Sequence, residues 1–163
     1  MTAGGDFSTT QVTSLGAGLP PIAKQLGYAG LIPQIAAVAV LVSGNPYWRF
    51  AALALAYAYA ALIFSFLGGL WWGLAAQSGG RAPKWTWVVA VLPSLVALVS
   101  AVPWAIGTPW PGPSLVCLGL SILGSLIVDH RLATLGLAPA GWMALRAPLA
   151  IGLGFLTLAA AFL

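Results

Sequence analysis

The sequence predicts an all-α membrane protein, folded as a bundle of five transmembrane helices. Of its 163 residues, 61% are hydrophobic and only 5% are charged, whereas a soluble domain carries about 25% charged residues. The apolar residues form continuous runs and not the alternating pattern of an outer-membrane barrel. So little polar surface excludes a cytosolic enzyme, a disordered region and a secreted disulfide scaffold.

The order of the elements follows from apolar runs long enough to cross a hydrocarbon core of about 30 Å. Residues 1–25 are polar, carry no secretory signal and predict a flexible cytoplasmic tail. Residues 26–163 predict a single transmembrane domain. Its spans are expected at about 26–43, 48–76, 85–106, 114–128 and 142–163.

Prolines fall inside three of these spans. Pro33 interrupts the first span, Pro93 and Pro103 lie in the third, and Pro148 lies in the first turns of the fifth. Membrane helices tolerate proline because neighbouring helices satisfy the freed backbone groups. The second span is long enough to tilt, and the fourth is expected to be the shortest.

The basic residues predict the direction of the bundle. One side of the predicted membrane region carries five of them, and the opposite side carries only Arg49. The five are Lys24, Arg81, Lys84, Arg131 and Arg146. By the positive-inside rule the N-terminus is cytoplasmic and the C-terminus lies outside. Residues 1–25 also lack the arginines of a mitochondrial transit peptide, and we expect a multi-pass protein of the bacterial inner membrane. The cations are too scattered for a nucleic-acid surface, and membrane lipid is the expected surrounding.

Small residues recur every four positions in the second span, at Ala61, Ser65, Gly69 and Gly73, with Gly68 beside them. Residues four apart lie near one helix face, and small residues let helix backbones approach closely. We expect this stripe mainly to pack inside the bundle. The alternative is that it receives a partner helix or a flat ligand.

A second series on the fourth span, Cys117, Ser121 and Ser125, ends in Asp129, one of only two acidic residues. Asp129 can be solvated at the helix end, or it can pair with Arg146 in the two-point geometry that suits a guanidinium and a carboxylate. The alternative for Arg146 is to snorkel to the interface. We expect the ion pair.

Groups suited to catalysis or to metal binding are scarce. The chain has one histidine, His130, one cysteine, Cys117, and two acidic residues, and it carries no phosphate-binding, zinc or hydrolase motif. The hydroxyls of Tyr57 and Tyr59 lie within the second span and are expected to be structural or to meet a quinone or polar lipid. We therefore expect no catalytic residue, no metal and no cofactor.

The segment from Tyr59 to Gly73 reads Y-A-A-L-I-F-S-F-L-G-G-L-W-W-G and resembles the core motif of the transmembrane protein 69-like family. The matching residues are Tyr59, Ser65, Phe66, Leu67, Gly68, Gly69, Trp72 and Gly73. Residues 26–33, and Asp129 followed by Trp142, Leu145 and Arg146, resemble the family too. Trp71 stands where the family often has His or Arg, and it is expected to remove a polar contact. The resemblance implies a five-helix inner-membrane protein and supplies no activity.

The matching segments share one depth on the predicted topology, which predicts one pocket in the cytoplasmic leaflet for a ligand or partner. Its expected residues are Tyr28, Tyr59, Ser65, Gly68, Gly69, Trp72, Asp129, Trp142 and Arg146. The leading functional hypothesis is a non-catalytic protein that packs against, assembles or stabilises a membrane complex, as a partner or a homo-oligomer. The alternative is binding or transport of a lipophilic molecule such as a quinone, lipid or tetrapyrrole. An intramembrane enzyme is the weakest hypothesis.

Overall fold

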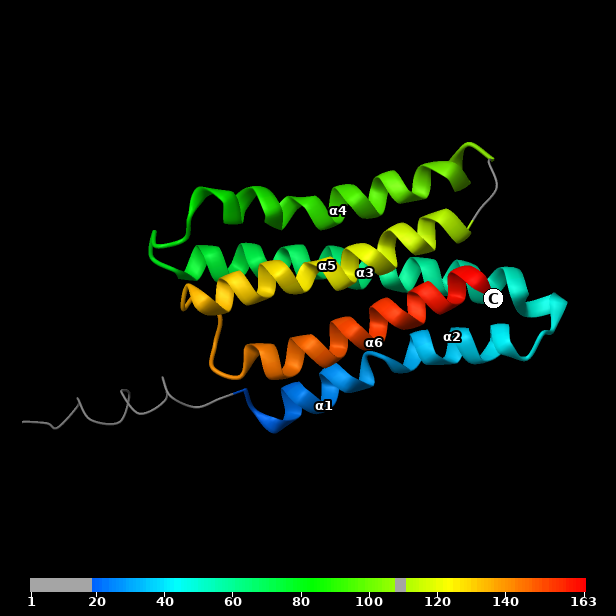
Figure 1. The fold of residues 1–163 in the computed structure, drawn as a ribbon, viewed down its shortest axis with the longest axis horizontal. Coiled ribbons are helices and arrows are strands. Elements are labelled where there is room, and N and C mark those ends of the chain that lie inside the picture. The colour runs from blue at the N-terminus through cyan, green and yellow to red at the C-terminus, as the bar shows by residue number, and fades with distance from the viewer. Residues whose placement is uncertain (1–18, 108–110) are drawn as a thin grey trace, which may run out of the picture.

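The computed structural model describes residues 19–107 and 111–163, and within these ranges it is all-helical (Figure 1). The predicted flexible tail lies outside the described residues as far as residue 18. The helices are α1 (Pro21–Ala29), α2 (Ile32–Val42), α3 (Pro46–Gln77), α4 (Lys84–Ala105), α5 (Gly112–Thr134) and α6 (Trp142–Phe162). Counting α1 and α2 as one broken span, five helices are long and apolar enough to cross a membrane, which confirms the predicted helical class.

The first span differs from its prediction at its start and at its middle. It begins at Pro21, so residues 21–25 are helical and do not belong to a tail. It breaks at Gly30 and Leu31, and Pro33 lies in the first turn of α2, where a missing N–H leaves no intrahelical bond unmade. The Tyr59 hydroxyl donates a hydrogen bond to the Gly30 carbonyl at the break.

The helix α5 runs to Thr134 and has 23 residues, against 22 in α4 and 21 in α6. The prediction that this span is the shortest and ends at residue 128 is therefore wrong. Asp129 and Arg131 lie in its last turns, and Leu132 beyond them is fully buried. The helix continues beyond these polar residues because its buried face still packs against the bundle.

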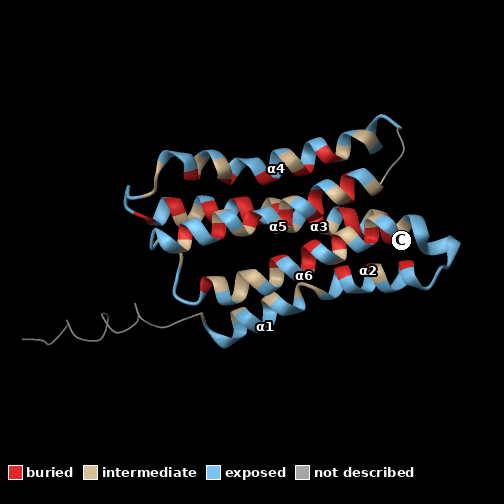
Figure 2. Cartoon of the chain, viewed as in Figure 1, coloured by how far each residue is buried: buried red, intermediate tan, exposed pale blue. Residues whose placement is uncertain are grey.

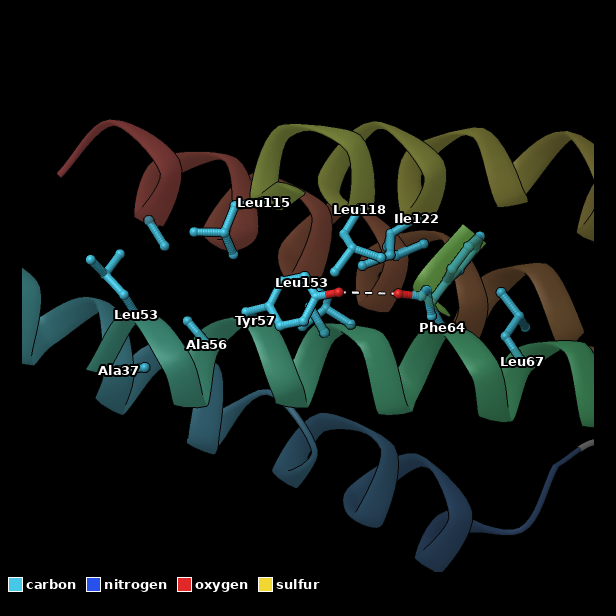
Figure 3. Close-up of a cluster of buried hydrophobic side chains, with 14 of the residues drawn as sticks. Ala37, Leu53, Ala56, Tyr57, Phe64, Leu67, Leu115, Leu118, Ile122 and Leu153 are labelled. Atoms are coloured by element: carbon cyan, nitrogen blue, oxygen red, sulfur yellow. Dashed lines mark hydrogen bonds between the residues drawn. The ribbon is translucent and has the colours of Figure 1, made fainter. Parts of the chain in front are cut away.

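The helices form a ring in the order α4, α3, α2, α6, α5, with further contacts from α3 across the ring to α5 and α6. Buried positions line the facing sides of these helices, whereas α1 has none (Figure 2). The core is built around α3, with α5 and α6 closing over it (Figure 3). Its members include Leu53, Tyr57, Phe64, Leu67, Leu115, Leu118, Ile122 and Leu153.

The glycines of α3 divide between two environments. A Cβ at Gly68 would overlap the Ala90 carbonyl oxygen of α4, whereas a Cβ at Gly69 or Gly73 would meet nothing within 4 Å. Because 3.6 residues make a turn, a four-residue series drifts by about 40° per step, or about 120° over three steps. The predicted stripe therefore turns away from its neighbours, and Gly68 makes the close approach.

A second pair of glycines lies where α5 and α6 meet, the most extensive helix pairing in the bundle. A Cβ at Gly119 would lie 2.7 Å from Leu158, and a Cβ at Gly154 would lie 2.7 Å from Leu123. Each glycine thus accommodates a leucine of the opposite helix. This pairing fixes α6 beside the end of α5 that carries Asp129.

We predict that Gly68→Ala destabilises the protein and that Gly69→Ala does not. Overpacking against a backbone atom costs about 1–3 kcal/mol, because the Ala90 carbonyl belongs to a helix and cannot rotate away. Unfolding by a denaturing detergent, followed by circular dichroism, measures the difference. Equal stability of the two variants would show that α3 and α4 are not held together at Gly68.

Candidate functional site

The side chain of Asp129 is fully buried and accepts hydrogen bonds from three residues on two other helices. The indole Nε1 of Trp71 on α3 donates to Oδ1 at 2.9 Å. The indole Nε1 of Trp142 on α6 donates to the same oxygen at 3.2 Å. The Nε of Arg146, also on α6, lies 3.0 Å from Oδ2 and forms an ion pair with it. We call these four residues the Asp129 cluster.

The local sequence places each of these groups. The four-residue series on α5 drifts from Cys117, which is exposed, to Ser125 and Asp129, which are buried. Gly141 has a φ of 79°, a left-handed conformation that glycine adopts without strain, and α6 starts at the next residue. Trp142 therefore stands at the first position of α6, and Arg146 follows it by about one turn.

The expected ion pair between Asp129 and Arg146 is confirmed, but its geometry differs from the expected two-point contact. Only Nε meets the carboxylate, because the two indole N–H groups occupy Oδ1. A buried charge is costly unless it is paired and hydrogen-bonded. Three donors on one carboxylate meet that requirement and tie α3, α5 and α6 together.

Trp71 corrects the expectation drawn from its position. It was expected to remove a polar contact, yet its indole nitrogen supplies one of the shortest hydrogen bonds to Asp129. Tryptophan combines a large apolar ring with one N–H donor, so it can bury the site and still satisfy the carboxylate. Its neighbour Trp72 is 47% exposed and packs edge-on against Trp87 of α4, with ring centroids 4.9 Å apart.

The nine predicted site residues do not form one pocket. Asp129, Trp142 and Arg146 come together, and the other six lie elsewhere. Tyr28 is 48% exposed on α1 and Trp72 faces outward. Gly68 lies under α4 and Gly69 meets no neighbour, Ser65 is half-buried, and Tyr59 binds the Gly30 carbonyl. Shared depth does not imply a shared face, because consecutive helical residues point about 100° apart.

The structure has instead a cavity of about 350 Å³ bounded by α1, α3 and α6. Its walls are apolar and include Leu26, Ile63, Phe66, Leu149 and Leu153. Trp142 and Arg146 line one end, and Arg146 is the only charged residue in the lining. The sequence did not reveal the part taken by α1 and Leu149, since these residues look like any others that face lipid.

Arg146 joins the cavity to the Asp129 cluster. Its side chain is 12% exposed, and its Nε bond to Asp129 is the one hydrogen bond that the described residues give it. The guanidinium group carries five N–H donors, and the described residues give its terminal nitrogens no hydrogen-bond acceptor. The arrangement presents hydrogen-bond donors at the end of an apolar chamber.

The described residues contain no cluster of three or more His, Cys, Asp or Glu side chains that could hold a metal ion. The Asp129 cluster itself contains one carboxylate, one guanidinium and two indoles, and the carboxylate accepts hydrogen bonds from the other three groups. Its groups can orient one another and can bind a hydrogen-bond acceptor.

A family model described as "Protein of unknown function (DUF3429)" matches residues 19–162. The chain belongs to the DUF3429 family. The DUF3429 match takes in every residue of the Asp129 cluster and the whole cavity. No curated protein and no solved structure matches the chain.

We predict that replacing one partner of the ion pair in this DUF3429 protein lowers the free energy of unfolding more than replacing both partners does. Asp129→Asn and Arg146→Met should each destabilise the fold by about 3–5 kcal/mol, because each leaves one charge without its partner. The double variant should be more stable than the sum of the two single losses implies. Detergent unfolding of all four proteins measures the coupling, and strict additivity would contradict a direct interaction.

Adjacent tryptophans provide a second test. Trp71→Phe removes one N–H donor from Asp129 and should cost about 1.5–3 kcal/mol, the range for hydrogen bonds to charged groups. Trp72→Phe makes the same substitution at a tryptophan that does not bond to Asp129. It should change the free energy of unfolding by less than about 1 kcal/mol. The same unfolding measurement compares them, and equal losses would reject a specific role for the Trp71 indole nitrogen.

Proposed function

We propose that the protein binds a lipophilic small molecule in the cavity between α1, α3 and α6. The observation that carries this proposal is an apolar chamber of about 350 Å³ whose single charged lining residue is Arg146. Ligand pockets are typically apolar with few polar groups that fix orientation. Asp129 holds the guanidinium group of Arg146 in place. We assign to Arg146 the role of orienting the ligand's acceptor atom.

The extent of the cavity supports an elongated ligand. Its α6 wall runs from Trp142 to Leu153, which at 1.5 Å per residue is about 16 Å, or roughly half of a hydrocarbon core. A head with an oxygen acceptor would lie at Arg146, and its tail would follow α6 toward the middle of the membrane. The volume is at the lower end of the range of about 300–1,000 Å³ for ligand pockets. It favours a quinone or a single-chain lipid over a tetrapyrrole.

The helix α1 supports access to the cavity from surrounding lipid. It has no buried residue, and its main packing partner is α6. The neighbouring residue Phe66 on α3 lines the cavity and is 64% exposed. A ligand would therefore pass between α1 and α3.

The direction and location of the bundle belong to the same proposal. Lys24, Arg81, Lys84 and Arg131 lie at one end of the helices, which we call the basic end, and Arg49 lies near the other. The positive-inside rule supports a cytoplasmic basic end, with the N-terminus inside and the C-terminus outside, in a bacterial inner membrane. The Tyr59–Gly73 motif supports kinship between DUF3429 and the transmembrane protein 69-like proteins.

A second candidate function is packing against a partner protein or a second copy, without catalysis. The observation that favours it is that a Cβ added at Gly69 or Gly73 on α3 would meet no atom of another helix within 4 Å among the described residues. Glycines at such positions admit close approach of another helix backbone. Neither of these two proposed functions, ligand binding or packing against a partner, includes catalysis.

We predict that Ile63→Trp weakens ligand binding strongly, because Ile63 lines the cavity and the larger indole would project into it. The probes are a photoreactive benzoquinone with one isoprenoid unit and a photoreactive palmitate, each added to the purified protein in detergent. Mass spectrometry of peptides should find the label on α1, α3 or α6 residues of the cavity. The labelled fraction should fall at least about tenfold in the variant.

The matched control is Leu62→Trp, which adds the same ring at a neighbouring position that is 68% exposed and outside the cavity. Its labelling should equal that of the unchanged protein. Label on residues outside the cavity, or an unchanged labelled fraction in Ile63→Trp, would reject ligand binding in the cavity. Packing against a partner would then be the better explanation.

A further inference from the structure

We infer that a second site, at the basic end, binds the headgroup of an anionic phospholipid. The site is a crevice of about 360 Å³ between the start of α4 and the last turns of α5. Pro83 and Trp85 line it on one side, and Val128, Arg131 and Leu135 lie on the other. It shares no lining residue with the cavity of the proposed function, so the two sites are independent.

The crevice carries positive charge that no acidic side chain of the described residues compensates. Arg131 lines it, and Lys84 adjoins Trp85; both side chains are exposed. Asp129 is the only acidic residue in the part of the chain that the structure describes. It is fully buried and paired with Arg146. Among the described residues Arg131 and Lys84 therefore meet no carboxylate, and an external anion would supply the opposite charge.

The apolar part of the crevice distinguishes a lipid from a free anion. Trp85 is 38% exposed, Ile127 is 71% exposed and Leu135 is 49% exposed, and all three line the crevice beside Arg131. A phosphate ion alone would make no contact with this apolar surface. A phospholipid would place its phosphate at Arg131 and an acyl chain along Ile127, which faces outward from α5.

Position along the bundle agrees with this occupant. The crevice lies at the end of the helices where Trp85 and Lys84 begin α4, and tryptophan prefers the level of the headgroups. Basic pockets between membrane helices on the cytoplasmic side bind acidic headgroups. The weak packing between α4 and α5, compared with that between α5 and α6, leaves room for one.

The test is native mass spectrometry of the protein in detergent with phosphatidylglycerol or phosphatidylcholine of identical acyl chains. The unchanged protein should retain one phosphatidylglycerol in preference to phosphatidylcholine. The variant Arg131→Gln/Lys84→Gln should bind it at least about tenfold more weakly, as expected for two lost charges near the membrane surface. Arg131→Lys keeps the charge and should keep most of the binding.

Lys24→Gln is the matched control, because Lys24 is an exposed cation of the same end on α1, outside the crevice. It should change the affinity by less than about threefold. Ile63→Trp should leave phosphatidylglycerol binding intact, which separates this site from the cavity. Circular dichroism of each variant checks that the fold is retained.

Three outcomes would overturn the inference. Equal weakening by Lys24→Gln would show diffuse attraction to the basic end, and equal retention of phosphatidylcholine would show that the charges do not matter. Complete displacement of the lipid by inorganic phosphate at matched concentration would identify an anion site that makes no use of the apolar wall.

Discussion

The buried carboxylate of Asp129 is the constraint on which the arrangement of the basic end depends. A single oxygen pair receives donors from α3 and α6 while it belongs to α5. Away from water a charge cannot remain unpaired, so the three helices must keep the rotations that bring these donors together. The carboxylate thus constrains how each of these helices is rotated about its axis. The glycine contacts of α5 with α6 and of α3 with α4 constrain the distances between the helices.

The same interaction determines what the cavity presents to a ligand. A lone arginine at this depth would turn toward the headgroups, since its long side chain can reach them. The bond from Nε to Asp129 opposes this and holds Arg146 in the lining of the cavity. The indole of Trp142 donates to Asp129 and Trp142 lines the cavity, so the Asp129 cluster and the cavity lining share Trp142 and Arg146.

The sequence predicted the helical class, the five membrane-length spans and the ion pair, because each depends on composition or on chain neighbours. It did not predict which side of each helix faces inward. In lipid both sides of a helix are apolar, so Phe64, which is 5% exposed, and Phe66, which is 64% exposed, look alike. The role of Trp71 and the place of Gly68 against α4 depend on that missing information. The end of α5 was predicted too early because polar residues resemble a helix end, whereas the buried Leu132 shows that packing continues.

The pairing of Asp129 with Arg146 also distinguishes this cation from Arg131 and Lys84. Arg146 is neutralised by Asp129 and faces an apolar cavity, where a second net charge would itself need compensation. A neutral head with a carbonyl or hydroxyl oxygen, as in a quinone, therefore suits that end better than an anion. Among the described residues Arg131 and Lys84 have no such partner, and both lie at the surface, where the anionic headgroup that we propose would supply the opposite charge. On these proposals the cavity and the crevice would select different lipids, because the described residues contain a single acidic side chain.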